Sequence, residues 1–293
     1  MKIDKLKNSR LWKIAGKVLN VIYWTMVTAT GVVVLYIVLL FTVFDTFHVP
    51  TSSMTPTLKP GTRGIINKLK MGGRYFDVYA AAAGRPHEVR RMPGYGRLEK
   101  GDIIVFNAPF TGSWDTVAMD MRRYYCKRAV GVAGDTLEVR KGHYRVSGFD
   151  GVLGVDREQE TVRMVAGDII RATPERGDLP GWVRCGPGEE GFGWTILNMG
   201  PLVIPSQGME MDLNRKNTIF YKKYIEWETG ESVVWDDSTA RIGGRPVSRY
   251  SFRENYCFAA GDHAIDSQDS RYFGLVPEKF IVGTVSLYGD LGF

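Results

Sequence analysis

Residues 18–44 read VLNVIYWTMVTATGVVVLYIVLLFTVF, a run without a single charged side chain. A helix rises about 1.5 Å per residue, so this run reaches about 40 Å and can cross a hydrocarbon core of roughly 30 Å. The few polar residues in it, Asn20, Thr25, Thr28 and Thr30, are compatible with insertion. The run therefore predicts a transmembrane anchor near the amino terminus.

Two other interpretations of this run are weaker. A cleavable signal peptide has an apolar region of only about 7 to 15 residues and a small-residue cleavage site. Here the run is longer and ends in Phe44-Asp45-Thr46-Phe47, which lacks that pattern. A buried core helix would show a polar face at helical spacing, and none is visible. We therefore expect an uncleaved anchor.

The charge of the chain is concentrated before the anchor. The formal net charge is +6 and the pI is near 9.1, values that raise the question of a nucleic-acid partner. Most of the excess lies in the basic segment 1–17, which contains Lys2, Lys5, Lys7, Arg10, Lys13 and Lys17 beside Asp4. By the positive-inside rule this segment stays in the cytoplasm and the chain after residue 44 lies outside. We therefore predict no nucleic-acid partner.

Beyond the anchor the sequence favours strands. Short β-branched runs alternate with Gly, Pro and Asp turns, as in Asp102–Phe106, Thr136–Val139 and Phe280–Val285. Such spacing predicts a mostly β fold with antiparallel sheets. Helical periodicity is weak except near Phe76–Ala83 and Asn217–Trp227.

Cysteine and histidine give no sign of a metal site. Three cysteines permit at most one internal disulfide, and whether Cys185 pairs with Cys257 stays open. The four histidines are scattered (His48, His87, His143 and His263) and form no ligand cluster with the cysteines. We predict neither a metal nor another cofactor.

Three polar segments carry possible chemistry. Pro50–Gly61 follows the anchor and holds Ser53, although a Ser/Thr/Pro linker is the ordinary interpretation of such a segment. Tyr124–Asp135 places Lys127 among apolar neighbours, where burial could favour the neutral amine that a general base requires. A surface lysine with a packed stem is the alternative. The third segment, Gly261–Gly274, reads as a polar turn entering a strand.

Together these segments resemble the type I signal peptidase (leader peptidase) family of membrane-bound serine proteases. The family's Ser-Met-x-Pro-Thr-Leu motif is present as Ser53–Leu58, and its Gly-Asp-Ile-Val-Val-Phe motif appears as Gly101–Phe106. Its Lys-Arg-x-x-Gly-x-x-Gly-Asp motif is Lys127–Asp135, and its Gly-Asp-Asn-x-x-x-Ser-x-Asp-Ser-Arg motif is Gly261–Arg271. His263 replaces the motif's Asn.

The resemblance implies a role for each matching residue. Ser53 is the nucleophile, Lys127 is the base, and Ser267 orients the lysine by a hydrogen bond. The backbone N–H of Ser53 and the Thr51 hydroxyl stabilise the oxyanion. Charged residues brace the site: Asp262, Asp269, Arg128 and Arg271. The family positions that line the substrate pockets correspond to Phe47, Val49, Pro50, Met54, Leu58, Tyr125 and Cys126.

The resemblance also implies a domain organisation. We expect a catalytic β domain at 45–140 and 251–293, a non-catalytic β cap at 141–250, and an insertion near 71–98 without a family counterpart. The insertion either rests on the membrane surface or is a solvated loop.

The implied function is a membrane-bound endopeptidase that removes signal peptides from exported preproteins after small-x-small sequences. Its partners are preprotein signal peptides and membrane lipid. It spans the cell (inner) membrane once, with an extracytoplasmic or periplasmic catalytic domain. Two alternatives are an inactive anchored scaffold and a self-cleaving Ser-Lys regulator of the repressor type. The regulator would be soluble with a DNA-binding domain, and no segment resembles one.

Overall fold

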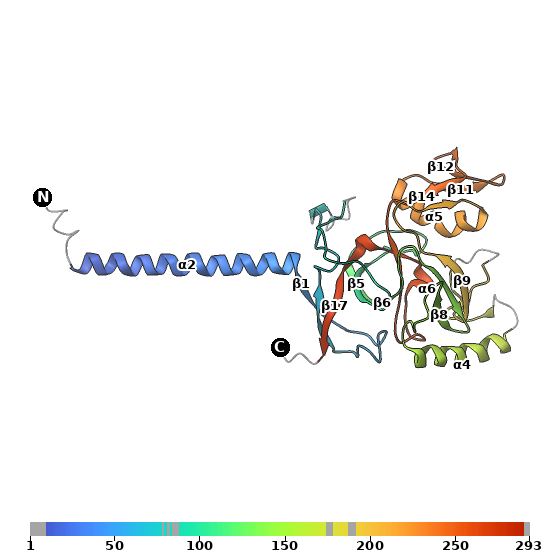
Figure 1. Cartoon of the computed structure of the whole chain (residues 1–293), viewed down its shortest axis with the longest axis horizontal. Helices are drawn as coiled ribbons and strands as arrows, with labels where there is room; N and C mark the ends of the chain where they lie inside the picture. The colour runs from blue at the N-terminus through green and yellow to red at the C-terminus, as the bar shows by residue number, and fades with distance from the viewer. Residues whose placement is uncertain are drawn as a thin grey trace.

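The computed structural model describes residues 10–77, 79–80, 83, 88–173, 178–186 and 192–289. Helix α2 (Arg10–Thr42) projects from one end of a β-rich body (Figure 1). Within the described residues it is the one helix long and apolar enough to cross a membrane, over Trp12–Leu40, and none of that stretch is buried in the protein. Residues 1–9 of the predicted basic segment lie outside the described residues.

The helix boundaries differ from the predicted span 18–44. The helix starts earlier, at Arg10, and ends at Thr42, because Phe44 already belongs to the first strand and pairs with Asn67. The apolar composition of the run therefore predicts the anchor correctly. It does not show where the helix ends, because the first residue of β1 is also apolar.

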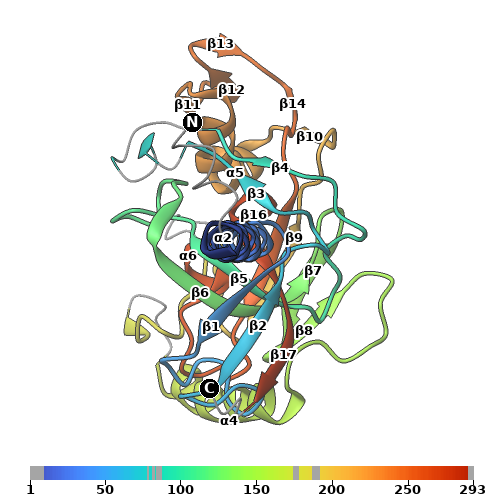
Figure 2. The same ribbon diagram turned by 90° about the vertical axis from the view of Figure 1, so that its left-hand side faces the viewer.

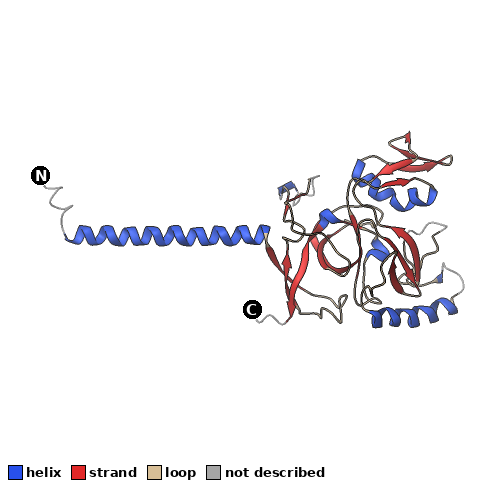
Figure 3. Ribbon diagram, viewed as in Figure 1, coloured by secondary structure: helices blue, strands red, loops and turns tan. Residues whose placement is uncertain are grey.

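The body is built on one antiparallel seven-stranded sheet. In spatial order its strands are β1 (Phe44–His48), β2 (Arg63–Asn67), β17 (Ile281–Gly289), β5 (Ile103–Ala108), β6 (Asp120–Gly131), β15 (Tyr256–Ala260) and β16 (Val276–Pro277). Both faces of β5 and β15 are buried, which explains their continuous apolar runs. Figure 3 shows strands dominating the body, and the predicted mostly β, antiparallel class is confirmed.

Smaller sheets extend this frame. Strands β7 (Thr136–Arg140), β8 (His143–Val146) and β9 (Asn198–Val203) form a second sheet. The other strands are paired in hairpins and short ribbons: β3 (Arg74–Tyr75) with β4 (Arg90–Arg91), β10 (Glu210–Asp212) with β14 (Arg249–Ser251), and β11 (Val233–Asp236) with β12 (Thr239–Ile242) and β13 (Arg245–Pro246). One hydrophobic core continues from the seven-stranded sheet into the second sheet.

Helices cover the part of the molecule farthest from α2. Helix α5 (Arg215–Thr229) includes the predicted piece Asn217–Trp227; its first turn is capped by the Asn214 side chain, and Gly230 ends it at φ +72°. Helix α4 (Asp156–Ala172) was not predicted. It is amphipathic and buries one face, with Gln159, Val162, Ala166 and Gly167, a helical periodicity that the prediction overlooked.

Short helical turns complete the chain near the site. They are α6 (Ser270–Phe273) and the 3-10 turn η2 (Glu278–Phe280). The other predicted helical piece, Phe76–Ala83, falls partly outside the described residues. Cys126 and Cys257 are free thiols, so the disulfide between Cys185 and Cys257 that the sequence left open is not formed.

Lys68 attaches the membrane helix to the sheet. It follows β2, and its Nζ donates to the Leu40 carbonyl at 2.7 Å and forms an ion pair with Asp45 at 3.0 Å. Its backbone N–H donates to the Val43 carbonyl at 2.9 Å. A cation at a helix C-terminus satisfies the last carbonyls and complements the helix dipole. The end of α2 and the first two strands are therefore joined by one side chain.

Candidate active site

Ser53 and Lys127 meet beside β6, an inner strand of the seven-stranded sheet. Ser53 lies in the turn that follows β1, and Lys127 projects from β6 opposite Ile104 of β5. The Lys127 Nζ and Ser53 Oγ atoms are 2.5 Å apart, although the two residues are 74 positions apart in the sequence. Pairing of strands from distant parts of the chain thus brings a hydroxyl and an amine into direct contact.

The environment of Lys127 favours its neutral form. The residue is only 2% exposed, and burial lowers its pKa below the ordinary lysine value. Asp269, Cys126 and Asp262 act in the opposite direction, but desolvation is the larger effect and the net pKa shift is downward. The amine can therefore accept a proton from Ser53 more readily than a solvated lysine can.

The turn that carries Ser53 is held from two sides. The backbone N–H of His263 donates to the Ser53 carbonyl at 3.1 Å. The Ser52 hydroxyl donates to Asp266 Oδ2 at 2.7 Å. The Thr51 hydroxyl lies 3.4 Å from Ser53 Oγ, so Thr51 flanks the same atom that contacts Lys127. Ser52 and Ser53 are thus fixed against the 261–271 segment.

Ser267 does not make the hydrogen bond with Lys127 that the resemblance implies. It is 8% exposed, and its Oγ has no hydrogen-bond partner within the described part of the chain. The hydroxyl lies instead against Gly261, where an added Cβ would come within 2.2 Å of Ser267 Oγ and 2.5 Å of the Ser53 carbonyl oxygen. Only glycine at position 261 permits the close approach of Ser267 and Ser53. The Lys127 amine contacts Ser53 rather than Ser267.

Two buried ion pairs hold the segments around the site. Arg128 contacts Asp262 through two bonds of 2.7 and 2.6 Å, and it donates to the Gly101 carbonyl. Arg271 contacts Asp269 through two bonds of 2.8 and 2.7 Å, and Asp269 also accepts from the Gly261 N–H. The two pairs therefore join β6 to the 261–271 segment and brace that segment internally.

The buried Asp269 is held in its ionised form. Burial by itself would raise the pKa of this carboxyl group, but the Arg271 charge and the hydrogen bonds from Arg271 and Gly261 outweigh it. The pKa of Asp269 therefore lies below its ordinary value. This negative charge also acts on Lys127, whose pKa it raises in part.

A cleft of about 730 Å³ opens beside Ser53 and Lys127. Six of the seven predicted pocket residues line it: Phe47, Val49, Pro50, Met54, Tyr125 and Cys126. Leu58 is fully buried behind the cleft and packs with Val49 and Met54. Burial raises the pKa of the Cys126 thiol to about 12, so this wall of the cleft is uncharged.

Seven further residues that line the cleft were not predicted: His48, Ser52, Pro60, Val105, Tyr124, Asp266 and Gln268. Most of them lie within or next to the matching motifs. Their position beside predicted site residues could therefore have indicated that they line the cleft.

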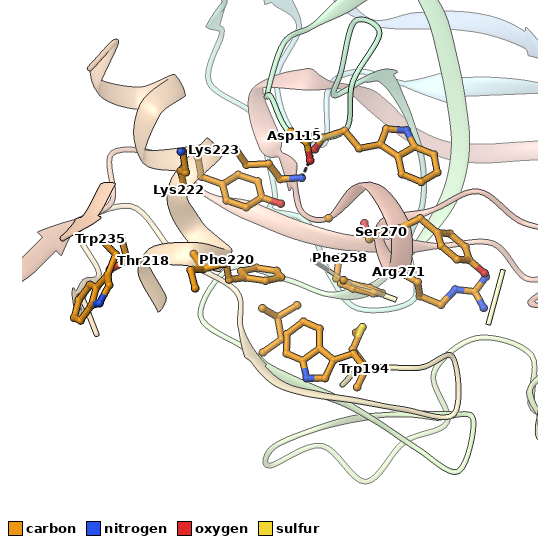
Figure 4. A pocket seen from close by; sticks show the side chains of 18 residues that line it. Asp115, Trp194, Thr218, Phe220, Lys222, Lys223, Trp235, Phe258, Ser270 and Arg271 are labelled. Carbon is orange, nitrogen blue, oxygen red and sulfur yellow. Dashed lines mark hydrogen bonds between the residues drawn. The ribbon is translucent and has the colours of Figure 1, made fainter. Parts of the chain in front are cut away.

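A separate pocket of about 470 Å³ contains a second lysine with a lowered pKa (Figure 4). Burial lowers the pKa of Lys223 to about 8. Its Nζ, however, donates to the backbone carbonyls of Trp114 and Phe273 at 2.7 and 2.8 Å. Neither Ser53 nor Lys127 lines this pocket, which is walled by aromatic rings such as Trp194 and Phe220. Lys223 therefore joins α5 to the loop at Trp114 and to the last residue of α6, and it has no part in the Ser53–Lys127 contact.

Within the residues that the structure describes, no group of three or more His, Cys, Asp or Glu side chains could hold a metal ion.

Known proteins similar to this chain share one description. The family model "Signal peptidase, peptidase S26" matches residues 21–164 and 235–288. Signal peptidase I of Haemophilus influenzae is 25% identical over 82% of this chain and 61% of its own length. Signal peptidase I of Pseudomonas aeruginosa is 31% identical over 85% of this chain and 66% of its own length, so the chain spans less than two thirds of both relatives.

A solved signal peptidase I from Enterococcus faecalis is 18% identical, and the match covers 65% of this chain and 97% of that chain at a TM-score of 0.27. The family model, in contrast, matches more than half of the sequence and includes both Ser53 and Lys127. The chain belongs to the signal peptidase S26 family.

Proposed function

We propose that this chain is a membrane-anchored serine endopeptidase that removes amino-terminal signal peptides from exported preproteins. The observation that carries the proposal is the 2.5 Å contact between Ser53 Oγ and the buried Lys127 Nζ at one end of an open cleft. Family membership supports the reaction class, and the apolar helix α2 supports anchoring in a membrane.

In this mechanism Lys127 enters the reaction as a neutral amine. Ser53 Oγ attacks the carbonyl carbon of the scissile peptide bond while Lys127 Nζ takes its proton. The Ser53 N–H and the Thr51 hydroxyl donate to the oxyanion of the tetrahedral intermediate. The C–N bond then breaks, Lys127 returns the proton to the leaving amine, and the signal peptide stays bound to Ser53 as an ester.

Water completes the reaction. Lys127 takes a proton from a water molecule that attacks the ester, and Ser53 recovers its proton as the signal peptide leaves with a new carboxylate. Ser267 is the proposed orienting group. Its buried hydroxyl has no hydrogen-bond partner within the described residues, so it can bond to Lys127 when Ser53 carries the acyl group.

The shape of the cleft supports specificity for small side chains. Its lining near Ser53 is largely apolar and includes the buried Val49 and Met54 together with Phe47, Tyr125 and Cys126. Signal peptides end in small-x-small sequences. Alanine-sized residues one and three positions before the cut fit such pockets, while the substrate adds to the protein as an extended strand.

The same proposal includes a membrane topology and a division of the chain into a catalytic domain and a cap. The basic residues before α2 remain in the cytoplasm, and the β-rich body lies on the outer side of the cell (inner) membrane. Residues 45–140 and 251–293 form the catalytic domain, because every proposed catalytic residue, from Thr51 to Ser267, comes from these segments. Residues 141–250 form a cap without catalytic residues.

Purified full-length chain in detergent should cleave a preprotein whose signal peptide ends in Ala-x-Ala. Mass spectrometry of the product should show a new amino terminus immediately after the second alanine. A matched substrate with tryptophan in place of that alanine should remain uncut, because the pocket is too small for it. A folded chain that cuts neither substrate, or cuts both alike, would contradict the proposal.

The rate should rise with pH on its acidic side. Because the pKa of Lys127 is lowered, the amine loses its proton at a lower pH than a solvated lysine, and only the neutral form accepts the Ser53 proton. We expect log kcat/KM to increase by about one per pH unit until Lys127 is neutral. Cleavage measured from pH 5 to pH 10 tests this, with Lys223→Gln as a control that leaves the acidic limb in place. A rate that falls with pH over that limb would exclude a lysine base.

A further inference from the structure

A second hollow of about 710 Å³ continues the catalytic cleft toward the membrane helix. Four residues line both spaces: Phe47, His48, Val105 and Tyr124. At its far end the hollow reaches Thr42, the last residue of α2. This hollow, here called the upstream chamber, is therefore adjacent to the cleft and lies between it and the end of the membrane helix.

The upstream chamber offers an apolar surface to a ligand. Phe76, Met92, Met121 and Val282 contribute to its walls. The cations in its lining already have partners within the protein. Lys68 is bonded to the Leu40 carbonyl and to Asp45, and Arg74 donates to the Phe280 carbonyl at 3.0 Å. An apolar guest fits these walls, because the Lys68 amine and the Arg74 guanidinium already donate to partners within the protein.

One wall of the upstream chamber is supplied by the insertion at 71–98. Two arginines attach β3 and β4 to the main chain just before β17: Arg74 donates to the Phe280 carbonyl, and Arg91 donates to the Glu278 carbonyl at 2.7 Å. Arg91 also donates to the Gly72 carbonyl, beside β3, at 2.9 Å. Figure 2, viewed along α2, shows β3 and β4 on one side of the helix and β1 and β2 on the other. The hairpin is thus a fixed wall.

We propose that the upstream chamber binds the apolar side chains of the signal peptide that precede its small-x-small residues. This inference rests on the proposed function. A signal peptide carries its apolar region before the cleavage site. Strand β1 leads from the end of α2 toward Ser53. With increasing distance from the membrane helix, the order is therefore the upstream chamber, the small pockets and Ser53. The substrate presents its apolar segment, small residues and scissile bond in the same order.

The length of an extended chain defines which substrate residues are involved. A strand advances about 3.3 Å per residue, so four residues upstream of the small pockets span about 13 Å. We assign the chamber to side chains of leucine size about four to seven positions before the cut. Such side chains contribute to substrate binding through burial, so the effect falls mainly on KM.

The test compares two substrates that differ only at positions four to seven before the cut, one with leucines and one with serines. For the full-length chain in detergent, the ratio of kcat/KM for the leucine over the serine substrate should fall about tenfold in Met121→Asp. Met92→Asp provides a second variant from the opposite wall. Met164→Asp is the matched control, because Met164 is 51% exposed on α4 and lies outside the chamber; its ratio should equal that of the unmodified chain.

A ratio that stays unchanged in both Met121→Asp and Met92→Asp would overturn the assignment. An effect that is equal for both substrates and appears only in phospholipid vesicles would also overturn it, because a lipid acyl chain would then be the guest. The proposed function is judged separately by whether the unmodified chain cuts the serine substrate at the expected bond. If it does, a failed ratio test removes only the chamber assignment; if it cuts neither substrate, both proposals fail.

Discussion

Ser53→Ala is expected to lower kcat for preprotein cleavage by a factor of about 10⁴ or more. The variant lacks the oxygen that forms the proposed acyl-enzyme, and among the described residues the hydroxyl that lies 2.5 Å from Lys127 Nζ is that of Ser53. Lys127→Met should have a comparable effect, because its side chain fills the same apolar space without accepting a proton. Combining the two substitutions should add little, since the two groups act as one unit. Single-turnover assays with excess enzyme would measure these rates.

A matched control separates chemistry from folding in this experiment. Ser113 lies in the exposed loop between β5 and β6 and bonds to Asp115, away from the cleft. Ser113→Ala should keep the rate of the unmodified chain, and circular dichroism should show that all variants are folded. If Ser53→Ala or Lys127→Met retained a rate within tenfold of the unmodified chain, the Ser-Lys mechanism would be wrong.

Arg271→Met is expected to reduce the free energy of unfolding by about 3 to 5 kcal/mol. Arg271 is 2% exposed and Asp269 is fully buried, and the two share a bidentate ion pair. Removing the guanidinium leaves a carboxylate in the core without its counter-charge, which is the costly way to break a buried pair. Urea unfolding followed by tryptophan fluorescence would measure the loss.

Removal of both charges provides the comparison for this prediction. Asp269→Leu combined with Arg271→Met should be more stable than Arg271→Met alone, because no isolated charge remains buried. If the single variant unfolds at the urea concentration of the unmodified chain, the pair does not stabilise the core. If the double variant is less stable than the single one, the loss comes from packing around Arg271 rather than from the lone carboxylate.

The fold class could be predicted from the sequence because the membrane helix and several strands each have a recognisable local pattern. The uncharged run located the membrane helix, and short β-branched runs located β5, β7 and β17. Helix α4 was missed although its apolar and polar residues alternate at helical spacing, so the signal was present in the sequence and was overlooked. The end of α2 was misplaced because Phe44 is as apolar as the helix that precedes it.

The candidate site was only partly predictable, for a different reason. No spacing rule brings Ser53 to Lys127 across 74 positions; the resemblance of four motifs did so, and the contact is present. The resemblance also implies a hydrogen bond between Ser267 and Lys127, and the structure does not contain it, because the lysine amine contacts Ser53 and the Ser267 hydroxyl has no partner among the described residues. The upstream chamber could not be predicted, since its walls come from strands and loops that only the tertiary fold brings together.

The attachment of α2 through Lys68 has a consequence for how cleavage sites are selected. Because the last turn of the helix is tied to β1 and β2, the proposed nucleophile Ser53 would stand at a set height above the bilayer surface. A signal peptide whose apolar segment remains in the lipid can then reach Ser53 only if its cut lies at the matching distance from the membrane. The protein would act as a ruler, so two identical small-x-small sequences at different distances from the same bilayer would be told apart.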